Sequence, residues 1–215
     1  MTAGEIAITP ASLVLPVPGA PLSVEIVEER ITKLPDGTSK TQVLTSKVYR
    51  DSTGRMRTEV DAVSGESPII VHIFDQAAGF MAILVPAEKA GGRFLFPKRE
   101  PSTQGVFAFF GGPLIMVPGK KTTRSESLGK QTIEGIEFEG TRTTTTVDDQ
   151  PSIIGVQDRW VADGLGLFGL EKSSGPDLEI TAKIRNLDRH EPDPELFKIP
   201  PSYNIRDLKP DDPAR

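Results

Sequence analysis

The two histidines, His72 and His190, are the first residues whose chemistry could serve a site. His72 lies inside the apolar stretch 68–74, which is typical of a core or cavity histidine that makes one hydrogen bond. His190 precedes Glu191 and Asp193 and could join them in a metal site, but neighbouring residues of one turn rarely converge on an ion. Because the sequence has no zinc or calcium spacing either, we interpret this segment as a solvated turn and expect no metal.

Nucleophilic and acid–base catalysis also find little support. There is no cysteine and no Gly-x-Ser-x-Gly motif, so thiol chemistry is excluded and a serine nucleophile has no signature. Glu137 and Glu139 alternate with apolar residues and indicate the wet face of a strand. We therefore expect no enzyme and no cofactor. A hydrolase with an unrecognised site remains a third hypothesis, for which His72→Ala is the first test.

Composition narrows the class of protein further. The 215 residues carry a net charge of -5 with both signs interspersed, which argues against a nucleic-acid partner. No apolar run approaches the length of a transmembrane helix. Residues 11–20 are a poor signal peptide because Pro16 and Pro18 interrupt them and no basic residue precedes them. If the protein is exported, we expect this sequence to be its mature form.

The elements that would position any site are strands. In residues 177–186 the apolar residues Leu178, Ile180, Ala182 and Ile184 alternate with polar ones, as in a strand with one buried and one wet face. Such strands belong to antiparallel sheets. We predict nine or ten strands in two meanders: residues 23–34, 38–50, 55–60, 68–74 and 80–85, then 128–133, 136–147, 156–162, 165–172 and 177–186. A loop is expected at residues 148–153, and Asp193 and Pro194 predict a short helix.

Three segments depart from this pattern. Residues 1–22 hold four prolines and form an extended arm, which either lies across the protein's own core or docks on another subunit. Residues 86–121 are an apolar insertion rich in glycine and proline, carrying a short helix or a flap. Residues 204–215 are predicted to be a flexible tail.

The insertion at residues 86–121 carries more large apolar side chains than a linker needs. Phe107, Phe109 and Phe110 lie close together in it, and burying each such side chain is worth roughly 1.5–3 kcal/mol. Something must therefore cover them. The cover could be the protein's own sheet, a bound lipid or another subunit, and the sequence leaves these three open.

The order of features resembles the periplasmic carrier of outer-membrane lipoproteins and its superfamily (LolA-like). The matching stretches are residues 48–59 (VYRDSTGRMRTE), 126–142 (ESLGKQTIEGIEFEGTR), 158–163 (DRWVAD), 184–187 (IRNL) and 194–203 (PELFKIPPSY). The resemblance covers residues 23–203 and implies a mainly β fold, a single curved antiparallel sheet that forms an unclosed barrel. It also implies export to the periplasm or the cell surface, and an apolar cavity.

We therefore expect a non-enzymatic protein that binds a hydrophobic ligand, such as a lipid or acyl chain, on the concave face of its sheet. The residues expected to contact the ligand are Phe107, Phe109, Phe110, Ile136, Phe138, Trp160, Leu178, Ile180 and Ile184, with residues 105–117 as a lid. The alternative is a structural protein that forms a homo-oligomer or fibre through the arm or the insertion.

Overall fold

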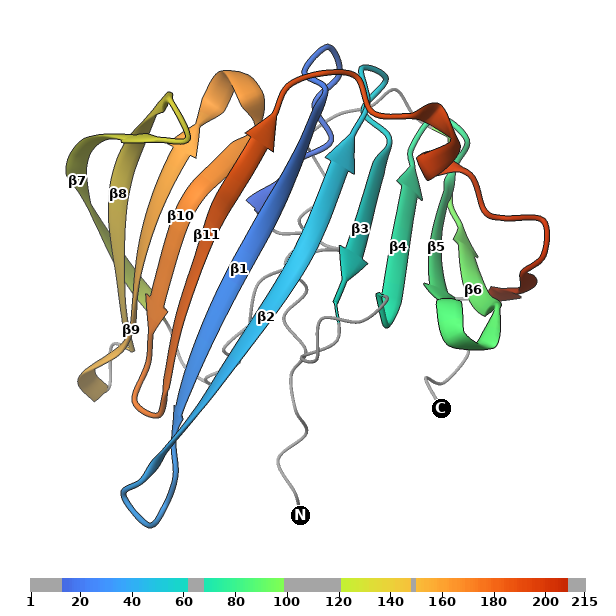
Figure 1. Cartoon of the computed structure of the whole chain (residues 1–215). Helices are drawn as coiled ribbons and strands as arrows, with labels where there is room; N and C mark the ends of the chain where they lie inside the picture. Colours follow the sequence, from blue (N-terminus) through green and yellow to red (C-terminus); the bar gives the residue numbers. More distant parts are fainter. Residues whose placement is uncertain (1–12, 62–67, 99–120, 148–149, 209–215) are drawn as a thin grey trace. The chain divides into compact units, whose positions relative to one another are not determined.

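The computed structural model describes residues 13–61, 68–98, 121–147 and 150–208. Its described strands form one 12-stranded sheet in the order β12-β6-β5-β4-β3-β2-β1-β11-β10-β9-β8-β7 (Figure 1). The two end strands, β12 and β7, do not pair with each other, so the sheet is unclosed. The predicted mainly β fold with an unclosed antiparallel sheet is therefore confirmed.

The strands follow the predicted alternation closely. Their bounds are Leu22–Lys33 (β1), Ser39–Arg50 (β2), Met56–Val60 (β3), Ile70–Asp75 (β4), Phe80–Val85 (β5), Ala90–Leu95 (β6), Lys121–Ile133 (β7), Ile136–Val147 (β8), Gln150–Ala162 (β9), Leu167–Ser174 (β10), Leu178–Asp188 (β11) and Asn204–Leu208 (β12). Three single turns of 3-10 helix are described: Pro86–Glu88 (η2), Asp163–Leu165 (η4) and Pro194–Phe197 (η5). Since β9 begins at Gln150, the predicted loop at 148–153 is too long.

The strand order joins two meanders. Strands β1 to β6 are neighbours in sequence order, as are β7 to β11, and β1 lies beside β11. The exception is β12, which pairs parallel to β6. The flexible tail predicted from residue 204 is therefore wrong for residues 204–208, where backbone pairing and the Arg93–Asp207 ion pair fix the chain.

Two compact units share these strands, and each is described by itself. The first contains residues 1–15, 27–43 and 104–184, and the second contains residues 16–26, 44–103 and 185–215. The first unit therefore holds β7 to β10 with parts of β1, β2 and β11. The second holds β3 to β6, η5 and β12 with the remaining parts.

In the first unit the described end of the arm packs on the sheet. Leu13 and Val14 are buried, Val14 pairs with Leu167, and the Leu15 amide donates to the Gly166 carbonyl at 2.8 Å. For residues 13–15 this favours an arm that lies on its own core. Residues 1–12 lie outside the described part.

In the second unit the C-terminal segment covers one face of β4 and β5. Val71, Ile73, Ala82 and Leu84 form a buried cluster on this face, which we call the Val71 face. Side chains from the C-terminal segment pack against it: Ile199, Tyr203 and Ile205. The short helix predicted at Asp193 is confirmed as η5, whose buried Phe197 lies under the Arg55 guanidinium at 5.1 Å.

The first part of the predicted insertion is regular structure. After η2 the chain returns as β6, so the meander continues to Leu95. Two adjacent glycines permit this packing, because a Cβ at Gly91 would lie 2.5 Å from the Ile83 carbonyl oxygen and one at Gly92 would lie 2.4 Å from Leu208. The insertion therefore begins later than residue 86, and residues 99–120 lie outside the described part.

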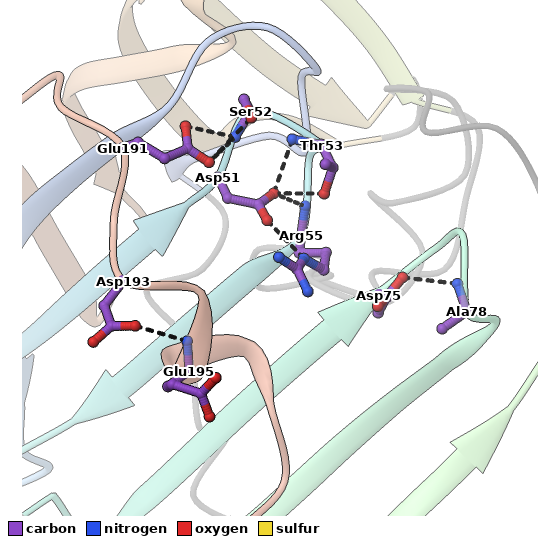
Figure 2. A network of polar contacts seen from close by, with 9 residues as sticks. All are labelled: Asp51, Ser52, Thr53, Arg55, Asp75, Ala78, Glu191, Asp193 and Glu195. Atoms are coloured by element: carbon purple, nitrogen blue, oxygen red, sulfur yellow. Dashed lines mark hydrogen bonds and ion pairs between the residues drawn. The ribbon is translucent and has the colours of Figure 1, made fainter.

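Carboxylates hold the loops at one end of the second unit (Figure 2). The buried Asp51 carboxylate accepts hydrogen bonds from Thr53 N and Oγ1 and from Arg55 N and Nε, at 2.6–3.0 Å. Glu191 accepts from the Ser52 backbone N and Oγ, which ties the C-terminal segment to the β2–β3 turn. These bonds satisfy the turn's donors and fix the start of the segment that covers the Val71 face.

Removing the Asp51 carboxylate should destabilise the protein. We expect Asp51→Ala to lower the free energy of unfolding by about 3 kcal/mol, as for one partner of a buried, hydrogen-bonded ion pair. The matched control is Asp36→Ala, since Asp36 makes the same two bonds to Thr38 in an exposed turn. Urea unfolding of both variants provides the measurement, and equal midpoints would contradict the account.

Candidate functional site

One face of the second unit is apolar from strand to strand. The even-numbered residues of β1 to β4 in this unit lie on this face, most of them buried, and we call this surface the Val48 face. Its apolar members, each at most 3% exposed, are Leu22, Val24, Ile26, Val48, Met56 and Phe74. The register places Val48 opposite Thr58, and Met56 opposite both Arg50 and Phe74. Side chains from four neighbouring strands therefore form one continuous surface.

On β1 to β3 the reverse side is polar. Tyr49 lies there, opposite Arg57, whose guanidinium pairs with Glu59 and donates to the Leu196 carbonyl. Burial raises the pKa of the Tyr49 hydroxyl, and the negative charges of Glu59 and Glu25 raise it further. On β1, which lies beside β2, the buried residues in this unit are the even-numbered Leu22, Val24 and Ile26, and we assign them to the Val48 face.

Hydrogen-bonding groups interrupt the apolar Val48 face. Arg50 is buried, and its Nε donates to the Ala20 carbonyl at 2.7 Å. Burial lowers the pKa of Arg50 to about 10, so its guanidinium stays charged at neutral pH. Ser46, Thr58 and the half-buried His72 lie on the same face. Such a surface offers apolar contact together with a few polar groups, the usual composition of a ligand site.

In the first unit, two aromatic side chains pack over glycines on one face of β8 to β10. We call this surface the Phe138 face. The buried Phe138 and Ile133 occupy the space that a Cβ at Gly169 would need, with contacts of 2.8–2.9 Å. The Trp160 indole occupies the corresponding space at Gly140, at 2.5 Å. Glycine is therefore required at positions 140 and 169, because the neighbouring aromatic side chains fill the space that a Cβ would need.

The opposite face of the first unit carries Phe168, Ile180, Ala182 and Ile184, and we call it the Ile180 face. Charged side chains cross it. Arg159 pairs with Glu171 at 2.9 Å and lies over the Phe168 ring, and Gln157 donates to the same carboxylate. Arg30 pairs with the buried Glu28. Burial raises the pKa of Glu28, the Arg30 charge opposes that effect, and the Glu171 charge adds to it.

The predicted contact residues do not share one surface. Ile136, Phe138 and Trp160 lie on the Phe138 face, because Gly140 pairs with Trp160. Leu178, Ile180 and Ile184 lie on the Ile180 face, since Ile180 pairs with Ser173 and Ser173 with Gln157. The prediction that these six residues line one face is therefore wrong.

A β-bulge in β10 is the physical reason. Phe168 pairs with Val161 and Leu170 with Trp160, so one extra residue, Gly169, stands between two consecutive pairs. Because side chains alternate with period two, a one-residue shift transfers every later side chain of the strand to the opposite face. Without the bulge, Ile180 and Trp160 would lie on the same side.

The other predicted site residues have mixed outcomes. Phe107, Phe109 and Phe110 lie outside the described residues, so their contact with a ligand stays a prediction. The interpretation of residues 188–193 as a solvated turn is confirmed, since the His190 side chain is 93% exposed beside Asp188. His72 lies on the Val48 face, where burial lowers its pKa.

Two further chemical features bear on function. Among the residues placed by the structure, no group of three or more His, Cys, Asp or Glu side chains is positioned to hold a metal ion. None of the described helices is long and apolar enough to cross a membrane.

Sequence reasoning did not single out Ser46, Arg50 or Thr58. All three stand in strands whose apolar residues are sparse, so their burial is not visible as an apolar alternation. The sequence signal that could have revealed them is their even numbering, because each of the three lies on the same side of its strand as Val48 or Met56. If the turn at Asp51 is used to fix the pairing of β2 with β3, that pairing identifies these three residues as neighbours of Val48 and Met56.

Comparison with known proteins gave matches among solved structures. No family model matches the chain, and no curated protein matches it. A LolA superfamily protein from Nitrosomonas europaea is similar at 6% identity and a TM-score of 0.43, covering 89% of this chain and 95% of that one. The Mycobacterium tuberculosis lipoprotein LppX is similar at 10% identity and a TM-score of 0.34, covering 78% of this chain and 87% of that one.

A putative outer-membrane lipoprotein-sorting domain from Vibrio parahaemolyticus is similar at 9% identity and a TM-score of 0.29, covering 77% of this chain and 84% of that one. Similarity of this extent assigns neither a ligand nor an activity to the chain.

The buried Glu28 predicts a definite pH dependence. A carboxyl whose pKa is raised by folding contributes stability that is fully present below its unfolded pKa and is lost as pH rises through the folded pKa. We therefore expect the stability of the wild type relative to Glu28→Gln to fall as pH rises from 4 to 8. Urea unfolding at each pH measures it.

The control is Asp158→Asn, for which the sign reverses. The hydrogen bonds from Arg142 lower the pKa of Asp158, so its contribution is present above the unfolded pKa and is lost as pH falls. The same slope for both variants would contradict the assigned environments.

The packing of Trp160 over Gly140 predicts a second effect. A methyl group at Gly140 would overlap the indole, so Gly140→Ala should destabilise the protein by about 1–3 kcal/mol. Gly164→Ala is the control, because no atom lies within 4 Å of its Cβ position. Thermal unfolding compares the two, and a neutral Gly140→Ala would place Trp160 elsewhere.

Proposed function

We propose that the protein is an exported, non-enzymatic binding protein that holds a hydrophobic ligand, such as an acyl chain, on the Val48 face. The observation that carries the proposal is a continuous apolar surface across four neighbouring strands, opposite a polar side on β1 to β3. The sequence predicted a ligand on the concave face of the whole sheet, and the present proposal restricts the binding site to the second unit.

The two apolar faces of the second unit differ in the cover that can be named for them. The Val71 face is filled by the chain's own Ile199, Tyr203 and Ile205. On the Val48 face, Phe96 stacks on Phe74 with ring centroids 5.6 Å apart and covers the side near β4. The apolar side chains of the Val48 face are at most 3% exposed without a ligand, so we propose that the ligand binds there by displacing part of the chain that covers them.

The size and chemistry of the face suit an acyl chain. Four strands at a spacing of about 4.8 Å give a surface about 14 Å across. Branched side chains and the flexible Met56 can adapt to a methylene chain. Burying ten methylenes would be worth roughly 8 kcal/mol at 0.8 kcal/mol each, which corresponds to a micromolar Kd before binding costs are subtracted.

The test uses delipidated protein and cis-parinaric acid as a fluorescent acyl probe. We expect the wild type to bind the probe and Val48→Phe to weaken binding at least tenfold, because the added ring fills the surface. The control is Val43→Phe, an exposed position of the same strand, which should bind within twofold of the wild type.

Circular dichroism must show both variants folded, since overpacking costs about 1–3 kcal/mol. Absence of probe binding by the wild type, or equal binding by both variants, would contradict the proposal. If Val48→Phe does not fold, Val48→Met provides the same comparison with a smaller change in volume.

A second candidate is self-assembly, and one observation favours it. Strand β7 spans Lys121–Ile133 and, among the described strands, pairs with β8 alone. A long unpaired edge is a template for strand addition by another copy. Native mass spectrometry separates the candidates: a multiple of the chain mass without an adduct favours assembly, and a monomer with an adduct favours the carrier.

A further inference from the structure

The single tryptophan of the chain, Trp160, lies in the first unit with glycines beside it. One line of cross-strand pairs crosses β7 to β11 there, and we call it the Trp160 row: Gly129–Gly140, Gly140–Trp160, Trp160–Leu170 and Leu170–Lys183. Directly paired residues of antiparallel strands point to the same side of the sheet. The row is therefore one strip of surface on the Phe138 face.

The indole ring of Trp160 lies flat on Gly140. A Cβ built on that glycine would lie 2.5 Å from Nε1 and equally far, 2.9 Å, from the adjoining ring atoms Cδ1 and Cε2. Such similar distances arise when a point stands over the face of a ring, because an approach within the ring plane sets both carbons much farther away than the nitrogen. One face of the indole therefore rests on the sheet, and the other face is turned away from it.

The outward side of the ring is open to a bound group. Trp160 is half-buried although the sheet covers one of its faces. Among the residues that the structure places, no aromatic ring stacks on the indole, no cation lies over it and no group accepts a hydrogen bond from its Nε1–H. The indole N–H of a buried tryptophan usually has a partner in the protein, so this donor is available to a ligand.

A second line of pairs, two residues further along the strands, carries charged side chains. Glu126 pairs with Arg142, Arg142 with Asp158 and Asp158 with Lys172, and we call these four residues the Arg142 row. Alternate residues of a strand lie about 6.6–6.8 Å apart on one face. The Arg142 row therefore runs directly beside the indole.

The Arg142 guanidinium keeps hydrogen-bond donors free within this row. Its Nε and Nη2 donate to the two oxygens of Asp158, at 2.6 and 2.7 Å. Its Nη1 lies 3.9 Å from the Glu126 carboxylate, which is too long for a hydrogen bond, and the side chain is 40% exposed. A planar, fixed donor group thus stands next to a planar aromatic surface.

We propose that the Trp160 row and the Arg142 row bind a saccharide chain, with one sugar ring stacked on the outward face of the indole. In β-linked glucose and N-acetylglucosamine units the ring substituents are equatorial, so the axial C–H groups form a flat apolar surface that matches the indole. The hydroxyls extend from the edge of the sugar ring. They can accept hydrogen bonds from Arg142 Nη1 and from the indole N–H, and they can donate to Asp158.

Other ligand classes fit these two rows less well. A nucleic acid needs excess positive charge, whereas the Arg142 row holds two acidic and two basic side chains. A quaternary ammonium group is bound by a cage of several aromatic rings, and Trp160 has no second ring beside it among the described residues. This inference does not depend on the hydrophobic ligand proposed for the second unit.

The test uses the fluorescence of Trp160, which reports on this site alone because the chain has no second tryptophan. We expect cellotetraose or chitotetraose, added to the full chain, to shift the emission saturably to shorter wavelength, because a stacked sugar excludes water from the indole. Isothermal titration calorimetry extends the comparison to variants. Trp160→Ala should weaken binding at least tenfold, Trp160→Phe should retain part of it, and Arg142→Lys should weaken it at least threefold.

The control is Leu95→Ala, which removes a 60% exposed apolar side chain from the second unit and should leave binding unchanged. Circular dichroism must show each variant folded, and if Trp160→Ala does not fold, Trp160→Phe and Arg142→Lys carry the test. If neither tetrasaccharide gives a saturable shift or a heat of binding, the proposal is overturned and Trp160 serves to cover Gly140, as aromatic residues do in other sheets. Binding that is equally tight in the wild type, Trp160→Phe and Arg142→Lys would place the saccharide elsewhere and would overturn it as well.

Discussion

The register between neighbouring strands determines which side chains can act together in this protein. In a sheet, alternate residues lie on opposite faces, so a shift of one residue changes the neighbours of every side chain beyond it. In the first unit one such shift occurs at Gly169, where the ring of Phe138 and the side chain of Ile133 leave no space for a Cβ. Because of this shift, Trp160 and Ile180 lie on opposite faces of the sheet.

The second unit has no such shift among β2 to β4, and its two faces differ in what occupies them. The pairs run without interruption from Arg50 through Met56 to Phe74. The Val71 face is filled by the segment that follows Glu191, which the Asp51 turn holds through Ser52. The Val48 face combines apolar side chains with the buried Ser46, Arg50 and Thr58, and the proposed ligand would bind against this mixed surface.

Much of the fold could be predicted from the sequence because alternation and turn chemistry are local signals. β8 begins and ends at the predicted residues, and the Asp193–Pro194 pair correctly placed η5. The strand β12 was missed since it is short, follows two prolines and pairs with a strand more than a hundred residues away. No local pattern marks such a parallel partner.

The candidate site was harder to predict for a related reason. Leu178, Ile180 and Ile184 were correctly recognised as one face of a strand, yet the bulge that sets their neighbours depends on the fit of Phe138 against Gly169. The buried Ser46 and Thr58 read as ordinary polar strand residues. Their burial follows from long-range packing, which the periodicity of a single strand does not contain.

The most direct test of the account is to locate a bound acyl chain by methyl NMR. Delipidated protein labelled at its Ile, Val and Met methyl groups would be loaded with deuterium-free palmitate, and intermolecular NOEs would be recorded. We predict NOEs from the chain methylenes to Ile26, Val48 and Met56, and none to Val71 or Ile73. NOEs confined to Ile180 and Ile184, or no bound palmitate at all, would contradict the assignment of the ligand to the Val48 face.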